Sequence, residues 1–297
     1  MTAVRLLYVS VKHIIPKFSL TKGLEMFLMK RKMLLSIIVL IVFVAGTAFS
    51  AFATDYFDES DLSKGLLHVT YTSASTSAMK VMIEKDTKRY TYDVNSIGVK
   101  ETFPLQLGDG DYKISLLQNT TGNSYKFITS KTVTVKITDP NSVYLGSIQN
   151  VNWSVDSAAV KKAVDLTKGT TDLYKKAQIL WSYMANNNKY NYTKLATLKT
   201  TYVPVIDATL RDKNGICYDF SSLYAAMLRS QGIPAKLVKG YAPNYAQGYH
   251  AWNEAYDSVN KKWVVIDSTY DLQVIKTKPK AVSMIKKTTE YQKVYEY

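Results

Sequence analysis

The stretch KNGICYDFSSLYAAMLRSQGIPAKLVKGY, residues Lys213–Tyr241, carries the strongest structural signal in this 297-residue chain. After Cys217, apolar residues recur at the spacing of one helix face. They are Phe220, Leu223, Tyr224, Met227 and Leu228. Gly232 and Pro234 end this helix, and residues 235–241 read as a β-strand. The sequence therefore predicts a helix that begins at the chain's only cysteine and leads into a strand.

A cysteine at this position suits nucleophilic chemistry. The free N–H groups and the positive end of the dipole at a helix N-terminus favour the thiolate. A lone cysteine is more often a small buried apolar side chain, but its position here counts against that interpretation. A nucleophilic cysteine needs a base. Of the three histidines, His13 precedes a predicted export signal and His68 lies in a strand of another domain. This leaves His250, in GYHAWNEAY, as the candidate base. It is followed by the acid Asp267, in KKWVVIDSTYD.

Strand alternation restricts how His250 and Asp267 can meet. Both lie on the arms of one predicted hairpin, whose turn is residues 257–261, and side chains on a strand alternate between faces. Two registers place them on one face: Asp257 opposite Asn260, or Tyr256 opposite Trp263. A shift of either register by one residue separates them. The shared face would also carry Trp252, Tyr256, Trp263 and Val265.

Four motifs combine in this region: G-x-C-x-D-(F/Y)-(A/S), LRxxGIPAxxVxGY, HAWxExY and W-x-x-x-D-(S/P)-T. They are matched by Gly215, Cys217, Asp219, Phe220, Ser221, Leu228, Arg229, Gly232–Ala235, Val238, Gly240, Tyr241, His250–Trp252, Glu254, Tyr256, Trp263, Asp267 and Thr269. Over residues 157–271 the sequence resembles the transglutaminase-like superfamily, a papain-like group of thiol enzymes. The resemblance implies Cys217 as nucleophile, His250 as base and then acid, and Asp267 as the group that orients the imidazole.

The resemblance also implies an oxyanion site. The main-chain N–H of the nucleophile would be one donor, and family members add an upstream polar or aromatic side chain. Tyr202 is the candidate for that second donor, and Trp252 is the candidate for lining the cleft. Asp219 and Glu254 match family positions but suit structural roles. Asp219 is a first-turn acid that fits the helix dipole, and Glu254 is expected to pair with Arg229.

Residues 1–53 form an N-terminal extension with a predicted signal peptide or membrane anchor. Lys30–Lys32 are a basic cluster, residues 34–45 are apolar, and Ala51-Phe52-Ala53 fits a cleavage site. The run from residue 33 to 53 is also long enough to remain as a membrane anchor. The sequence therefore predicts a bacterial protein that is secreted or held at the cell surface.

The remaining chain divides into three parts. Residues 54–64 are polar and acidic and are predicted to be a spacer. Residues 65–139 contain about seven short strands separated by turn signals, which indicates an antiparallel β-sandwich. Residues 140–297 form the transglutaminase-like domain, an α+β papain-like core of helices packed on an antiparallel sheet. Two helices are predicted at 157–167 and 172–187, the second capped by Thr171. Residues 192–212 hold one short helical turn, and the Lys-rich tail 273–297 has a weak helical pattern on the surface.

The composition limits which binding partners and cofactors are expected. The net charge is +14, but the lysines are scattered and no nucleic-acid motif is present, so nucleic acid is not an expected partner. An exported basic protein would adhere to anionic envelope polymers or lipid headgroups. One cysteine and few histidines leave no usual zinc site, and the calcium loop pattern D-x-D-x-D-G is missing. No metal or other cofactor is therefore expected.

Two functions follow from the sequence. The first is an exported thiol acyltransferase or hydrolase that acts on protein or peptide carboxamides by crosslinking, deamidation or proteolysis. The alternative is a non-catalytic surface module for binding or scaffolding, because a fold does not fix a function. The complete Cys217, His250 and Asp267 set favours the enzyme, and reactivity of the thiol would discriminate the two.

Overall fold

The computed structural model describes residues 56–297 except 73–76, 96, 244–247 and 280–281. The predicted extension and signal segment, residues 1–53, lie outside these described residues. Within the described part, no helix has the length and apolar character needed to cross a membrane.

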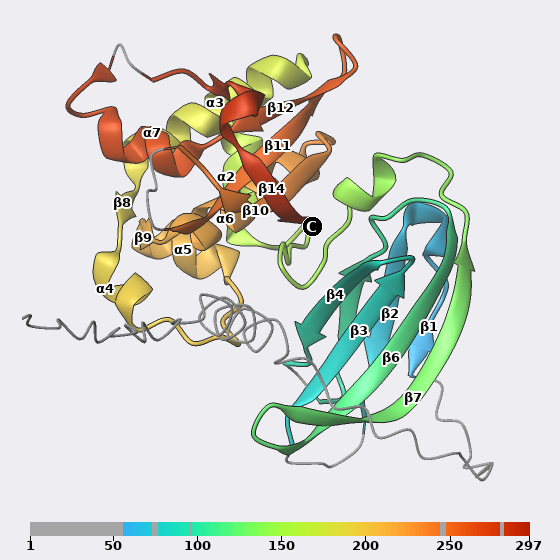
Figure 1. The fold of residues 1–297 in the computed structure, drawn as a ribbon. Helices are drawn as coiled ribbons and strands as arrows, with labels where there is room; N and C mark the ends of the chain where they lie inside the picture. The colour runs from blue at the N-terminus through green and yellow to red at the C-terminus, as the bar shows by residue number, and fades with distance from the viewer. Residues whose placement is uncertain (1–55, 73–76, 96, 244–247, 280–281) are drawn as a thin grey trace, which may run out of the picture. The chain divides into compact units, whose positions relative to one another are not determined.

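The first half is an antiparallel sandwich of two sheets (Figure 1). One sheet has the order β1-β2-β5, with β1 at Phe57–Asp58, β2 at Leu66–Thr70 and β5 at Lys100–Pro104. The other has the order β4-β3-β6-β7, with β3 at Met79–Lys85, β4 at Lys88–Asp93, β6 at Gly110–Thr121 and β7 at Ser124–Val135. Alternate residues of both sheets share one buried core, which includes Leu67, Val81, Phe103, Ile114 and Val133. The predicted sandwich is confirmed.

The predicted spacer at 54–64 is wrong for its described residues. Phe57 is buried and β1 pairs with β2, while Leu62–Lys64 form a 3₁₀ helix, η1. His68 holds this segment in place, because its ring nitrogens lie 3.0 Å from Asp61 Oδ2 and 2.8 Å from Thr102 Oγ1. Burial of Phe57, strand pairing and the His68 contacts together attach this polar segment to the sheet.

The second half is built around α6 (Cys217–Ser230), which lies in the largest buried cluster together with residues of the surrounding helices. Six α-helices lie within the described residues. The other five are α2 (Ala158–Leu166), α3 (Leu173–Asn187), α4 (Tyr192–Ala196), α5 (Ile206–Asp212) and α7 (Ser268–Val274). One sheet has the order β13-β12-β11-β10-β14 and is antiparallel throughout. Its strands are β10 (Ala235–Tyr241), β11 (Tyr249–Asp257), β12 (Lys262–Ile266), β13 (Ile285–Lys286) and β14 (Gln292–Glu296). Helices packed on an antiparallel sheet are the α+β arrangement that the sequence predicts.

Local details differ from the prediction in two places. The N-cap of α3 is Asp172, whose side chain accepts the Lys175 main-chain N–H, and not Thr171. Residues 192–212 hold two helices, α4 and α5, instead of one turn. Strand β8 (Lys189–Tyr190), just before α4, pairs in parallel with β9 (Asn214–Gly215), just before α6, and so ties the two ends of this segment together.

The tail is the main correction. Residues 273–297 are predicted to be weakly helical and superficial, yet β14 pairs with β10 at one edge of the central sheet. Main-chain bonds between Tyr297 and Leu237, 2.8 and 3.0 Å long, extend this pairing. Gly240 permits the close approach, since a Cβ there would lie 2.1 Å from the Gln292 carbonyl oxygen. Part of the expected helix is therefore a strand of the sheet (Figure 1), whereas the expected surface position holds, since four residues of β14 are exposed and the fifth is partly buried.

Candidate active site

Cys217 is the first residue of α6 and is 7% exposed. The helix start is fixed by Asp219, whose Oδ2 accepts the Ile216 main-chain N–H at 2.9 Å. Gly215 is needed beside it, because a Cβ at that position would lie 2.9 Å from the Asp219 side chain. The thiol thus sits where unpaired N–H groups and the positive end of the helix dipole favour a negative charge.

The hairpin register places His250 and Asp267 together. Tyr256 lies opposite Trp263, which is one of the two registers that the sequence allows. Asp267 follows β12 directly and is the N-cap of α7, where its Oδ1 accepts the Tyr270 main-chain N–H at 2.9 Å. Its Oδ2 lies 2.9 Å from His250 Nε2. Because helix capping holds the carboxylate in place, its second oxygen is directed at the imidazole.

The imidazole of His250 is almost fully buried, as is the carboxylate of Asp267. Burial lowers the pKa of His250, but the charge and hydrogen bond of Asp267, with a hydrogen bond and charge from Cys217, outweigh this and raise it to about 9. With Nε2 taken by Asp267, Nδ1 is the nitrogen left for the thiol. The three predicted residues therefore form one connected group, and the imidazole holds its second proton at neutral pH.

Trp252 and Tyr291 pack beside this group, and Trp252 projects from the same face of the sheet as His250 because the two residues are two apart on β11. Trp252 is 1% exposed and stacks on the His250 ring, with the ring centroids 6.2 Å apart. Tyr291 packs on Trp252 at 5.1 Å and its hydroxyl donates to Asp267 Oδ2 at 3.1 Å. Trp252, the candidate for lining the cleft, packs against the imidazole, where it restricts the ring.

The tyrosine beside the thiol is Tyr190, not the expected Tyr202. The Tyr202 hydroxyl donates to Asp219 and accepts from Lys194 Nζ at 2.7 Å. Tyr190 lies opposite Gly215 in the β8–β9 pair, and Gly215 is two residues before Cys217. Burial raises the pKa of Tyr190, and the charge and side-chain hydrogen bond of Cys217 add to this while the Cys217 main-chain N–H opposes it. The geometry therefore favours Tyr190 over Tyr202 as the hydroxyl at the nucleophile.

The expected pairing of Glu254 with Arg229 is wrong. Glu254 lies 2.8 Å from Lys293 Nζ and 3.8 Å from Lys236 Nζ. Arg229 is 2% exposed and its guanidinium donates to the main-chain oxygens of Ala235, Gly146 and Tyr297 at 2.6–3.0 Å. Both residues hold strands in place, as expected of structural residues, but through different partners.

Residues 160–268 match the family model of the transglutaminase-like superfamily. These residues are a transglutaminase-like domain. A 109-residue stretch is also 29% identical to the uncharacterized Bacillus subtilis protein YebA, over 35% of this chain and 15% of YebA. This chain thus matches a minor part of that relative's length.

Solved structures resemble the chain more distantly. A candidate cysteine protease from Cytophaga hutchinsonii is 17% identical, with 78% of this chain and 76% of that chain covered and a TM-score of 0.42. Legionella pneumophila LapG is 16% identical, with 47% of this chain and 70% of that chain covered and a TM-score of 0.35.

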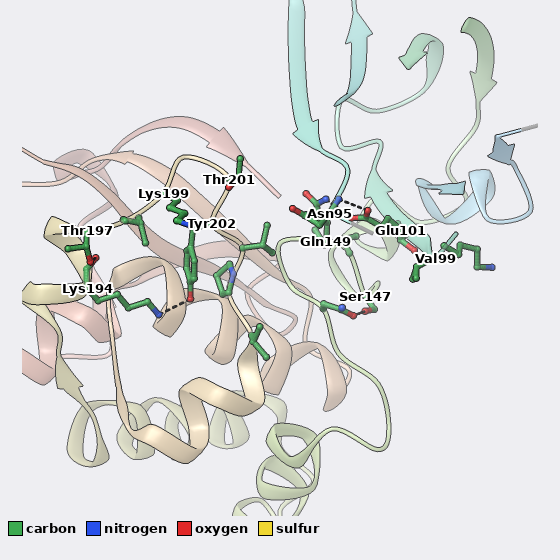
Figure 2. A pocket seen from close by; sticks show the side chains of 18 residues that line it. Asn95, Val99, Glu101, Ser147, Gln149, Lys194, Thr197, Lys199, Thr201 and Tyr202 are labelled. Carbon is green, nitrogen blue, oxygen red and sulfur yellow. Dashed lines mark hydrogen bonds between the residues drawn. The ribbon is translucent and has the colours of Figure 1, made fainter. Parts of the chain in front are cut away.

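A pocket of about 680 Å³ borders the transglutaminase-like domain but contains none of the three predicted catalytic residues. It lies between the α4–α5 segment and residues 147–152 with β5, and Figure 2 shows Lys194 and Tyr202 on one side and Gln149 and Glu101 on the other. Tyr202 connects its wall to Asp219 and so to the start of α6. Since the pocket holds no nucleophile and base, the candidate site stays at Cys217.

The described residues contain no cluster of three or more His, Cys, Asp or Glu side chains that would hold a metal ion. Sequence reasoning missed Tyr190 and Tyr291 as parts of the site. Tyr190 lies just after the predicted helix at 172–187, and nothing in its local sequence indicates a role. Tyr291 carries no local signal, because it reaches Asp267 only through the pairing of the C-terminal strand.

Proposed function

We propose that the transglutaminase-like domain is a thiol acyltransferase or hydrolase that attacks carboxamides of proteins or peptides. The observation that carries this proposal is the connected group at the start of α6. Cys217 lies at the helix N-terminus, His250 adjoins it, and Asp267 accepts from His250 at 2.9 Å. This is the arrangement of nucleophile, base and orienting group that acyl transfer requires.

The reaction starts from an ion pair. His250 holds a proton at neutral pH, because Asp267 and Cys217 together raise its pKa to about 9 against the opposing effect of burial. A cation beside a cysteine favours the thiolate. The thiolate attacks the carboxamide carbon, the imidazolium protonates the leaving amine, and a thioester forms. Water or a second amine then attacks the thioester, and the imidazole takes up its proton, which restores the thiolate–imidazolium pair.

The oxyanion of the tetrahedral intermediate needs two donors. The main-chain N–H of Cys217 and the hydroxyl of Tyr190 are neighbours, since Tyr190 lies opposite Gly215 in the β8–β9 pair and Cys217 shifts the pKa of Tyr190. Burial raises the pKa of Tyr190 first, and the neighbouring Cys217 raises it further. The hydroxyl therefore keeps its proton at physiological pH and can donate it to an oxyanion.

We further propose that the chain works outside the cytoplasm, either secreted or held at the surface. The basic cluster, apolar run and A-x-A site within residues 29–53 support export. Its positive net charge suits adhesion to anionic envelope polymers or lipid headgroups. A fusion of residues 1–60 to a periplasmic reporter enzyme tests export, and reporter activity confined to the cytoplasm would contradict it.

The decisive experiment incubates the protein with a glutamine-containing protein and a labelled primary amine, beside a Cys217→Ala control. Ammonia release and amine incorporation are recorded together. Incorporation that vanishes in the variant indicates a crosslinking transferase. Ammonia or new peptide termini without incorporation indicate a hydrolase. If neither appears and the thiol is unreactive, the domain is a binding module and the proposal fails.

A further inference from the structure

Lys239 lies on β10 directly before Gly240, the residue that pairs with His250. Its side chain projects from the sheet face that α6 covers, because its Nζ lies 3.6 Å from the centroid of the Tyr218 ring. Tyr218 follows Cys217 in α6. The Tyr297 ring centroid is 5.2 Å from the same Nζ. The ammonium group thus contacts two aromatic rings, one of them on the residue that follows the nucleophile.

No acidic side chain pairs with this lysine. It is partly buried, and its ammonium group forms no ion pair or hydrogen bond with the side chains that the structure describes. Lys236, on the same strand but the opposite face, pairs with Glu296 at 3.1 Å and Glu254 at 3.8 Å. Burial lowers the pKa of Lys239 to about 8, with the nearby Cys217 acting in the opposite direction. A buried cation without an acid is costly unless another molecule supplies the negative charge.

The surroundings of Lys239 are open to a ligand. Tyr241 and Tyr249 lie on the same face of the sheet by strand alternation, with ring centroids 5.8 Å apart. They are 52% and 49% exposed. Tyr295, opposite Lys239 on β14, is 39% exposed. These half-exposed tyrosine rings offer a surface on which a peptide can pack beside the ammonium group.

We propose that Lys239 binds a carboxylate of the acyl-donor substrate, so that the preferred donor is an acidic peptide whose free carboxylate lies close to the reacting carboxamide. This inference rests on the proposed function, since it places the carboxamide at Cys217. His250 already provides a positive charge for the thiolate, and Lys239 therefore remains available for a second anion. A carboxylate that enters between the tyrosine rings would offset the cost of burying the cation and so favour substrates that carry one.

The first test uses two small alkylating reagents that differ in charge. Iodoacetate carries a carboxylate and iodoacetamide is its neutral analogue, and both report on Cys217 without any need for turnover. The ratio of their alkylation rates is measured for the wild type, Lys239→Met, Lys239→Arg and the control Lys189→Met, which removes an exposed cation beside Tyr190. We expect the iodoacetate-to-iodoacetamide ratio to fall about tenfold only in Lys239→Met, the effect of one charge-assisted hydrogen bond.

The outcomes separate the possible roles. A ratio that Lys239→Met leaves unchanged overturns the inference. Both reagents slowed equally also overturns it, because Lys239 would then act on the thiolate and not on an incoming carboxylate. Circular dichroism establishes that the variants are folded, and Lys239→Arg keeps the selectivity if charge is what matters. A wild-type thiol that is inert to both reagents overturns the proposed function itself, and the inference with it.

The second test measures turnover of two glutamine peptides that differ only in glutamate or glutamine beside the reactive residue. The wild type is expected to prefer the acidic peptide by about tenfold in kcat/KM, mainly through KM. Lys239→Met should lose this preference, so that the ratio of its kcat/KM values for the two peptides approaches one. Equal use of both peptides by an active wild-type enzyme would overturn the inference and leave the proposed function standing.

Discussion

The buried His250–Asp267 pair predicts a specific dependence of stability on pH. In the folded state the pKa of His250 is about 9, against an ordinary value of 6.5. Burial opposes this rise, and the Asp267 carboxylate 2.9 Å away is its main cause. Because the folded state holds the proton more tightly than the unfolded chain, the protonated imidazole stabilises the fold. The stabilisation is complete below pH 6.5 and is lost as the pH rises through about 9.

The size of the effect follows from the shift. One pKa unit corresponds to about 1.4 kcal/mol, so a rise from 6.5 to about 9 corresponds to roughly 3 kcal/mol of unfolding free energy. The assay is urea denaturation of the wild type and His250→Gln at a series of pH values. Since other groups titrate in both proteins, the quantity of interest is the difference between their unfolding free energies. That difference should decrease by roughly 3 kcal/mol across this range.

Two further variants test which neighbouring group raises the pKa of His250. Cys217→Ala should reduce the pH dependence but keep its sign, since Asp267 contributes more than Cys217 to the raised pKa of His250. Asp267→Asn should remove most of it. If the difference between wild type and His250→Gln is flat, or grows as the pH rises, the imidazole is not held as a cation and the proposed ion pair is wrong.

Three other substitutions test separate parts of the structure. Tyr190→Phe should lower kcat by about 100-fold with little change in KM, measured by steady-state kinetics with a labelled amine, and an unchanged kcat would exclude its hydroxyl as an oxyanion donor. Arg229→Met should cost about 3–5 kcal/mol in urea denaturation, because three buried main-chain oxygens lose a charged donor; a loss below about 1 kcal/mol would contradict this. Gly240→Ala should cost about 1–3 kcal/mol and speed hydrogen exchange in β14, since its Cβ would lie 2.1 Å from the Gln292 oxygen; unchanged exchange there would refute the close approach.

The sequence predicts well those helices and strands in which buried apolar residues recur at a regular spacing. The apolar face after Cys217 recurs at helical spacing, and α6 is buried along nearly its whole length. Strand β10 coincides with the predicted residues 235–241. The hairpin register was restricted to two choices by requiring His250 and Asp267 to share a face, and the structure has one of them. In each case, hydrophobic burial imposes a period that can be read from the sequence.

The strand β14 shows why the tail was misjudged. Four of its five residues are exposed and the fifth is only partly buried, so its sequence carries no apolar alternation. Main-chain hydrogen bonds to β10 hold it in place, and these bonds leave no pattern in side-chain type. The two-residue strands β8 and β9 pose the same difficulty, and they are the elements that bring Tyr190 to Cys217.

Strand alternation separates Glu254 from Arg229. Asn253 donates to the Ser221 carbonyl oxygen on α6, so this residue points to the face that the helix covers. Its neighbour Glu254 must then point to the opposite face, away from Arg229 on α6. Opposite charge alone suggested the pair, whereas the strand alternation already applied to His250 would have excluded it.

The segment beyond the matched residues 160–268 completes the candidate site. Tyr291 donates to the same Asp267 oxygen that receives His250 Nε2. The Tyr297 ring lies against the Lys239 ammonium group, and β14 covers the strand that carries it. Orientation of the carboxylate and placement of the unpaired cation therefore both depend on residues that follow the family motifs. If Lys239 selects acidic substrates as proposed, we expect this preference to depend in part on a strand whose own sequence carries no catalytic signature.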